Sequence, residues 1–384
     1  MNTDRAPTAF DPANLTPSAS INRALIADLP GIVPDPDVRG LTGYEVLSAD
    51  ALAAAIAPRA AALGLDPASN PMELLPAFDR CLNTHDPTIR TTAHALARDF
   101  GRSLGYFVFM LHRGDAINRY ARDDWDAACW EYWAGVRTVW LGGGIASGRL
   151  GTSLREHAAA VLEECGCSAP TLHLARHAAI LPLIGTVRSL PASPTARPTE
   201  AAIVLDFGGT TIKRAHATYT GGVLASLNIL SPLPTTHLSL GRSSEPPGDT
   251  EIAYQFAERM ADIIAATWRA ATSPGFPLIP HVVVSLACYV RDGHPLLRQS
   301  GRYTDLCALP QPAAHYLSRL LTNRIGQDVA ITLLHDGTAA ARTYAGVSHA
   351  AVIMLGTALG IGFPPPAIGA RRPLSPHFSI TPAR

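Results

Sequence analysis

Short apolar runs divide the chain into predicted strands, and helical periodicity fills the stretches between them. The runs lie at 136–141, 201–205, 280–287, 329–334 and 350–355, and they are rich in β-branched residues. Apolar residues recur at three- and four-residue spacing in 70–81, 87–112, 154–164 and 251–271. An alanine-rich helix is predicted from Ser48, as its N-cap, to about Ala62. Strands that alternate with helices in this way indicate an α/β protein.

The strand at 201–205 ends in a turn with candidate chemistry. The residues from 201 to 214 are AAIVLDFGGTTIKR, so Asp206 ends the strand and a glycine pair follows. Glycines let the chain turn back with exposed amides that can hold phosphate oxygens, and a carboxylate at a strand end can hold Mg²⁺ directly or through water. The predicted contacts are Asp206, Gly208, Gly209, Thr210 and Thr211. An ordinary tight hairpin is the alternative.

Two further strand ends carry similar residues. The strand at 350–355 leads into a glycine-rich turn with Gly356, Thr357 and Gly360. The strand at 329–334 leads into His335 and Asp336 at the start of an alanine-rich helix. A carboxylate at such a helix start is a candidate general base, kept ionised by the helix dipole, or simply the N-cap of the helix.

Together these three motifs resemble the actin, Hsp70 and sugar-kinase superfamily, and most closely its ROK and hexokinase-type sugar kinases. The family pattern of D-x-G-G-T, N-D-x-x-x-A-A and L-G-T-G-x-G is met by 206–210, 335–340 and 355–360. The resemblance implies two lobes, each offering a phosphate-binding turn to one ATP. It also implies Mg²⁺ near Asp206, with Lys213 compensating phosphate charge or lying as an exposed strand lysine.

The same resemblance implies transfer of the γ-phosphoryl group to a sugar hydroxyl, with Asp336 as base. Substrate contacts implied more weakly are His335, Asp305, Asp292, Glu45 and Ser48. Two departures bear on the substrate. The family has Asn where this chain has His335, and neither the E-x-G-H element that holds the sugar nor the cysteine-rich zinc element of ROK proteins has a counterpart.

The order of the motifs indicates a circular permutation. Gly142, Gly143 and Gly144 follow the strand at 136–141 and resemble the turn that closes over adenosine, which normally stands last in the family. Residues 185–190 resemble the final family helix, and a proline-rich linker at 191–200 precedes the strand that normally stands first. We therefore expect a circularly permuted, two-lobed actin-like ATPase (ribonuclease H-like) fold.

This order predicts the domains. Residues 1–190 form the adenosine-side lobe, with an N-terminal extension at 1–37 that is ordered only in part; residues 201–345 form the phosphate-1 and substrate lobe, and 346–384 begin the adenosine-side lobe again. The rival is an unrelated helical domain fused to half a kinase. A dinucleotide fingerprint at Gly142–Gly148 is disfavoured, because its glycines are one residue too far apart for G-x-G-x-x-G.

Composition narrows the partners. The 384 residues include 31 Lys and Arg against 31 Asp and Glu, so no net charge favours nucleic acid or an anionic membrane. We expect a cytoplasmic protein, since no long apolar span or secretory leader is evident, with a sugar-like small molecule as partner; a homodimer is left open. The six cysteines are expected to be reduced, and zinc at Cys165, Cys167, His173 and His177 is not predicted.

The resulting functional hypothesis is an ATP- and Mg²⁺-dependent carbohydrate kinase. The alternative is a non-catalytic regulatory protein of the same fold that binds a nucleotide or a sugar. Retention of both Asp206 and Asp336 favours the enzyme.

Overall fold

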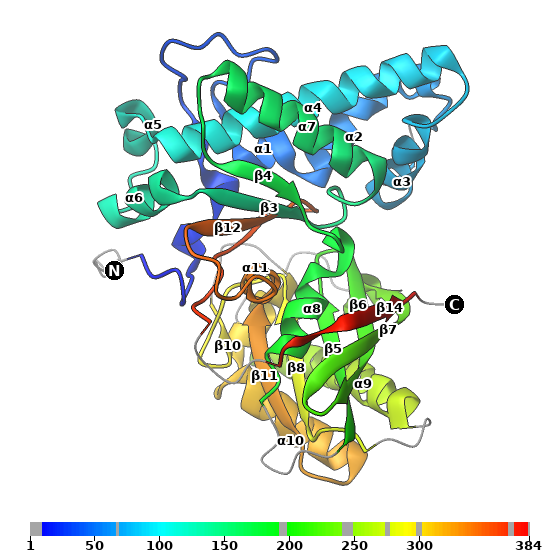
Figure 1. Cartoon of the computed structure of the whole chain (residues 1–384). Coiled ribbons are helices and arrows are strands. Elements are labelled where there is room, and N and C mark those ends of the chain that lie inside the picture. Colours follow the sequence, from blue (N-terminus) through cyan, green and yellow to red (C-terminus); the bar gives the residue numbers. More distant parts are fainter. Residues whose placement is uncertain are drawn as a thin grey trace. The chain divides into compact units, whose positions relative to one another are not determined.

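The structure, a computed structural model, describes residues 10–66, 69–191, 198–239, 249–272, 277–296, 302–367 and 372–382. It divides into two compact units, each assembled from distant parts of the chain (Figure 1). Unit 1 consists of Met1–Ala13, Ser18–Leu181 and Val347–Phe363, and unit 2 consists of Asn14–Pro17, Pro182–Gly346 and Pro364–Arg384.

Unit 1 is built on a four-stranded sheet of order β13-β12-β3-β4. Three strands are parallel to one another: β12 (Ala350–Met354), β3 (Thr138–Gly142) and β4 (Thr171–Leu174). The fourth strand, β13 (Gly360–Gly362), is antiparallel to β12. The helices of this unit are α1 (Gly43–Leu47), α2 (Ala49–Ile56), α3 (Pro71–Cys81), α4 (Pro87–Arg113), α5 (Ala116–Tyr120), α6 (Ala127–Gly135) and α7 (Gly148–Glu164). Figure 1 shows α4 and α7 side by side next to this sheet.

Glycines on α4 permit its close contact with α7. A Cβ on Gly105 would lie 2.6 Å from the Val161 Cβ and 2.8 Å from the Ala158 carbonyl oxygen. Side chains at this point would push the helices apart, so two glycines one turn apart, Gly101 and Gly105, let the backbones approach.

The N-terminal segment is more structured than its sequence predicts. Strand β1 (Leu25–Ile26) pairs with β2 (Leu41–Thr42), and Ile21 and Ile26 are fully buried. Its elements are two or three residues long, too short to give a recognisable period. The tryptophans at 125, 130 and 133 are buried in the core, as expected for packing residues.

Unit 2 is built on a six-stranded sheet of order β11-β8-β5-β6-β7-β14. Its strands are β5 (Thr199–Phe207), β6 (Thr211–Thr220), β7 (Val223–Pro234), β8 (His281–Leu286), β11 (Ala330–His335) and β14 (Leu374–Thr381), with a small hairpin of β9 (Val290–Arg291) and β10 (His294–Pro295). Its helices are α8 (Leu181–Arg188), α9 (Thr250–Thr272), α10 (Ala313–Ile325) and α11 (Asp336–Arg342). Strands β5, β8 and β11 are parallel, whereas β5, β6 and β7 form an antiparallel meander.

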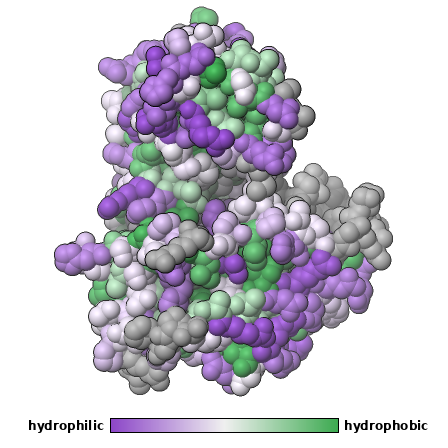
Figure 2. Space-filling model, turned by 90° about the vertical axis from the view of Figure 1, so that its right-hand side faces the viewer, coloured by the Kyte–Doolittle hydropathy of each residue, from purple (hydrophilic) through white to green (hydrophobic). Residues whose placement is uncertain are grey.

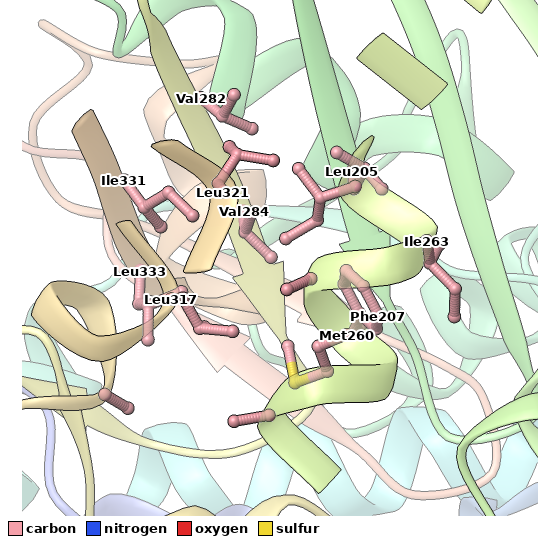
Figure 3. Close-up of a cluster of buried hydrophobic side chains, with 14 of the residues drawn as sticks. Leu205, Phe207, Met260, Ile263, Val282, Val284, Leu317, Leu321, Ile331 and Leu333 are labelled. Atoms are coloured by element: carbon pink, nitrogen blue, oxygen red, sulfur yellow. The ribbon is translucent and has the colours of Figure 1, made fainter. Parts of the chain in front are cut away.

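The two faces of β5 have different roles. Its odd-numbered residues Ile203, Leu205 and Phe207 belong to a core with side chains of β8, β11, α9 and α10, shown in Figure 3. Successive side chains of a strand point to opposite faces, so the even-numbered residues, including Asp206, face the other side.

The helices α8 and α11 touch each other so closely that a Cβ on Gly185 would lie 1.5 Å from the Ala339 carbonyl oxygen.

The division differs from the predicted domains in two places. Residues 182–190 and the segment after 363 belong to unit 2, because β14 pairs in parallel with β7. Within the predicted linker, 192–197 lie outside the described residues, and Thr199 and Glu200 already belong to β5. Glu200 is buried and pairs with Arg372 at 2.9 Å, which ties the segment before β14 to this strand.

The surface offers no sign of a membrane-spanning element. In the described ranges, every helix is too short or too polar to cross a bilayer. Hydrophilic and hydrophobic residues are interspersed on the face drawn in Figure 2.

Candidate active site

A polar row crosses three adjacent strands of unit 2 on the face opposite the core of Figure 3. Lys213 on β6 and Ser285 on β8 are both register partners of Asp206 on β5, so the three side chains share one face. The Lys213 Nζ lies 3.2 Å from Asp206 Oδ2, and the Ser285 hydroxyl donates to Asp206 Oδ1 at 2.8 Å. The Asp206 side chain is only 3% exposed, so these partners compensate its buried charge.

Asp336 lies on the same side of the sheet. Leu334 is the register partner of Ser285, and Asp336 follows two residues later, directly after β11. Burial, and then the negative charge of Asp206, raise the pKa of Asp336 to about 7. The Asp336 side chain is still 23% exposed, so a ligand can reach it. A reachable carboxyl group with a pKa near neutrality suits general acid–base catalysis.

His335 is the last residue of β11 and also the N-cap of α11. Its Nδ1 accepts a hydrogen bond from the Thr338 backbone N–H at 3.3 Å. Burial lowers the pKa of His335 to about 3, so the imidazole is neutral at ordinary pH. Its Nε2 lies 3.2 Å from Asp336 Oδ1, and because the ring is neutral this contact is not an ion pair. Asp336 is the first residue of the helix, and its own Oδ1 accepts from Gly337 N at 2.6 Å.

The glycine turn between β5 and β6 has its carbonyl groups tied back and two amides open. Tyr303 donates to the Gly208 carbonyl at 2.6 Å, and the Thr235 hydroxyl lies 3.2 Å from the carbonyl oxygens of both Gly209 and Thr210. Within the described ranges, the amides of Gly209 and Thr210 form no hydrogen bond. Consecutive open amides of this kind form an anion-binding concavity.

Two glycine turns meet in unit 1. The Leu355 amide donates to the Gly142 carbonyl at 2.8 Å, and a Cβ on Gly143 would lie 2.1 Å from the Leu355 carbonyl oxygen. Gly143 also has a φ of 92°, in the region that favours glycine. Gly144 has open space beside it. The structure thus brings Gly142–Gly144 together with the turn after β12, as neighbours on one sheet.

The turn after β12 runs only from Gly356 to Leu359. The predicted contact Gly360 instead begins β13 and is buried, because it pairs with Met354. Ala49 donates to the Gly356 carbonyl at 2.8 Å, and the buried Asn22 side chain holds both backbone groups of Leu359 at 2.8 and 2.7 Å. In this part of the described chain, the amides of Gly356, Thr357 and Ala358 are left without hydrogen bonds.

The side chains predicted to contact a sugar serve other roles or lie apart. Glu45 forms a capping box with Thr42, and Ser48 caps α2; both belong to unit 1. Asp292 has a φ of 51° in the tight turn of the β9–β10 hairpin. Asp305 lies two residues after Tyr303, and burial raises its pKa. Of the predicted substrate contacts, the structure brings only His335 into contact with Asp336.

The available donor groups limit which metal ion this protein could hold. The described residues contain no group of three or more potential ligands, at the Cys165–His177 segment or elsewhere. Mg²⁺ commonly takes only one or two carboxylates and completes its shell with phosphate oxygens and waters. Asp206 fits that role, because the Lys213 ammonium already lies at its Oδ2 as a cation would.

Comparisons with known proteins give only slight similarity. No family model and no curated protein matches the chain. Solved structures that match include the Aquifex aeolicus member of the Ppx/GppA protein family, at 11% identity and a TM-score of 0.19 over 35% of this chain and 36% of that one. A type II variant of the Aquifex aeolicus Ppx/GppA phosphatase matches at 10% identity and 0.19, over 36% and 37%. The chain thus spans little more than a third of those structures.

These matches correct the predicted activity. The matched structures are Ppx/GppA proteins, one of them called a phosphatase, and none is described as a sugar kinase, which contradicts the prediction of an ATP-dependent carbohydrate kinase acting on a sugar hydroxyl. The ROK assignment and the alternative of a regulatory protein find no support in them. The structure shows a mixed α/β protein with parallel strands in two compact units.

Sequence reasoning missed three residues that contact the site or its turns. Ser285 interrupts the apolar run from Val282 to Leu286 in β8, and this pattern could have revealed it. Tyr303 and Asn22 lie about 95 and 337 residues from the backbone groups they hold, so no local pattern indicates them.

Proposed function

We propose that this protein hydrolyses a phosphoanhydride bond of a nucleotide or a polyphosphate at the site formed by Asp206 and Asp336. One observation carries the proposal: a reachable carboxyl group with a pKa of about 7 lies on the same face of the sheet as Asp206, Lys213 and the open amides of the Gly208 turn. These are the parts that phosphoryl transfer requires, namely amides for phosphate, a cation and a base.

The acceptor in this proposal is water. Transfer to an organic hydroxyl needs side chains that hold the acceptor, whereas the predicted candidates Glu45, Ser48 and Asp292 serve as helix caps or lie in a hairpin turn. Water needs only a base and an aligned phosphorus atom. The type II variant of the Aquifex aeolicus Ppx/GppA protein is called a phosphatase, which agrees with a hydrolytic reaction.

The amides and charged side chains of this site have separate roles in the proposed reaction. The Gly209 and Thr210 amides would hold oxygens of the terminal phosphate, with Lys213 offsetting its charge. Asp206 would hold Mg²⁺, which when bound supplies charge neutralisation at the phosphate. Asp336 accepts a proton from water as the water oxygen bonds to phosphorus. The bond from phosphorus to the bridging oxygen breaks, and the leaving phosphate keeps the electron pair.

The ionisation of Asp336 gives this step a pH dependence. Only the ionised carboxyl accepts a proton, so the rate should rise as pH increases through about 7. The raised pKa makes the ionised form a stronger base than an ordinary aspartate.

The permuted order of the chain is part of this proposal. The sheet of unit 1 combines β3 and β4 from the first half with β12 and β13 from the last part of the chain. Rejoining the ends of an ancestral chain and opening it elsewhere would produce such an arrangement. On this view, Gly142–Gly144, Gly356 and Thr357 would form a phosphate-binding site of unit 1.

The test is release of inorganic phosphate from ATP and from polyphosphate, with and without Mg²⁺. Asp336→Asn should reduce the rate by a factor of about 10³ while nucleotide or polyphosphate binding persists. Wild-type protein that releases no phosphate from either substrate, or an Asp336→Asn variant at full rate, would contradict the proposal.

A further inference from the structure

The hydrogen bonds of His335 determine which of its ring nitrogens carries the proton. A backbone N–H can only donate, so Nδ1, which faces Thr338 N at 3.3 Å, must be the unprotonated acceptor. A neutral imidazole carries its single hydrogen on the other nitrogen. The buried ring of His335 is therefore the Nε2–H tautomer.

This tautomer places a donor against one particular oxygen of Asp336. Nε2 lies 3.2 Å from Oδ1, and the Gly337 amide donates to the same oxygen at 2.6 Å. The hydrogen bond from the Gly337 amide and the nearby Nε2–H group both attract Oδ1, which favours one rotation of the carboxyl group. Oδ2 is then the oxygen left to receive a proton from the attacking water.

The ring itself is held in place by Tyr289. The two rings are stacked with centroids 4.3 Å apart and planes 18° from parallel. Tyr289 is 5% exposed and lies between β8 and β9, so its own position is fixed by its packing. Together, the Thr338 amide and the Tyr289 ring leave the imidazole a single orientation.

We propose that His335 is a positioning residue that, as its Nε2–H tautomer, holds Oδ1 of Asp336 and directs Oδ2 toward the attacking water. This inference rests on the proposed hydrolysis. Because the imidazole is neutral, it orients the base without adding a positive charge that would weaken it. The Asn expected at this position in the resembled sugar kinases has no nitrogen at the place of Nε2.

A pair of substitutions separates the capping role from the positioning role. Asn places its polar atoms near those of Nδ1, so His335→Asn keeps a good helix cap and loses the donor to Asp336. Gln reaches the place of Nε2, so His335→Gln keeps that donor and is the poorer cap. We expect His335→Asn to lower kcat about 10-fold, His335→Gln to recover most of that loss, and KM to stay unchanged in both.

A higher kcat in His335→Asn than in His335→Gln would overturn the proposal. If His335 acted only as a cap, His335→Asn would be the more active and the more stable of the two. His281 offers the matched control, since its half-buried ring bonds to Thr332 at 2.8 Å at the other end of β8 and β11. His281→Asn and His281→Gln should leave kcat unchanged.

A measurement without turnover separates this inference from the proposed function. Nitrogen-15 NMR of the free protein should show the His335 ring neutral, with Nε2 protonated, throughout pH 5.5 to 8 (about 1 unit or more above the lowered pKa). A protonated Nδ1 would overturn the inference even if phosphate release were confirmed. If NMR shows the expected tautomer but the protein releases no phosphate, hydrolysis is refuted. The inference that His335 positions Asp336 then still stands.

Discussion

The glycine turn of unit 2 and the glycine turn of unit 1 share one construction. In each, side chains or backbone amides from distant segments hold the carbonyl groups, and consecutive amides remain open. They differ in the charges beside them. Asp206, Lys213 and Asp336 lie by the turn after β5, whereas the turn at 356–359 is held by the neutral Asn22 and by Ala49.

This difference separates holding a phosphate group from reacting with it. Open amides alone can bind an anion, because they supply hydrogen bonds and partial positive charge. Bond cleavage also needs a base and a counterion for the developing charge. We therefore assign the chemistry to unit 2, and variants of the two turns should affect different measurements.

The largest effect is expected at Asp206, the carboxylate that the unit 1 turn lacks. Asp206→Asn should lower the rate of phosphate release by a factor of about 10³, equivalent to about 4 kcal/mol, because cation binding is lost. Steady-state assays at several Mg²⁺ concentrations measure this loss. Asp262→Asn is the control, since it removes a 67% exposed carboxylate of the same unit that pairs with Arg324. Equal losses in both variants would contradict the assignment.

Gly143→Ala should have the next largest effect, on stability. The new Cβ would lie 2.1 Å from the Leu355 carbonyl oxygen at a φ of 92°, so we expect a loss of about 3 kcal/mol or more in unit 1. Gly208→Ala, with its Cβ 2.9 Å from the Thr211 oxygen, should cost about 1 kcal/mol. Hydrogen exchange of β3 and β12 amides, compared with those of β5 and β8, measures each unit separately. Equal protection of the β3 and β12 amides in Gly143→Ala and Gly208→Ala would contradict the expected difference between the two substitutions.

Asn22→Ala tests the clamp of the unit 1 turn. It removes both side-chain bonds to Leu359, so we expect a loss of about 2 kcal/mol in unit 1 and weaker binding of phosphate by its turn. Asn118→Ala is the matched control, because Asn118 is also buried and bonds Ala27 and Asp28 in the same unit. Denaturant unfolding and a binding titration with inorganic phosphate measure the two effects. Weakened phosphate binding in both variants would show that general destabilisation, and not the turn, is responsible.

The smallest effect is expected on stability from Asp336→Asn. The folded-state pKa of about 7 lies above the unfolded value of about 3.9, so the folded state binds the proton more tightly between these values. The stability that this proton contributes is lost as pH rises through about 4 to 7. Asn cannot ionise, so the variant should gain about 1 kcal/mol over wild type when pH is raised from 6 to 8. Urea midpoints at both pH values measure this, and an unchanged difference would refute the raised pKa.

The elements of both units were largely readable in the sequence. The predicted strands at 201–205 and 329–334 match β5 and β11, and the helix at 251–271 matches α9, because long apolar periods survive tertiary packing. Strand β14 was not predicted. It is mostly exposed and contains Pro376 where its register with β7 breaks, so it lacks an apolar pattern.

The site was readable only in part. The motifs indicated Asp206 and Asp336 because a carboxylate directly after an apolar strand is a local signal. The pairing of Lys213 with Asp206 depends on the register of the β5–β6 hairpin, and the stacking of Tyr289 on His335 depends on tertiary packing. A single sequence contains neither. The acceptor was predicted wrongly, because the phosphate motifs carry no information about the nucleophile.

The place of β12 has a consequence for synthesis of the protein. This strand lies between β13 and β3, yet it comes from residues 350–354, whereas the rest of unit 1 apart from 347–363 precedes residue 182. A ribosome therefore releases most of unit 1 long before its central strand emerges, and the edge of β3 stays unpaired meanwhile. Unit 1 is therefore completed only once residues 347–363 have emerged, and until then its nascent chain needs protection from aggregation.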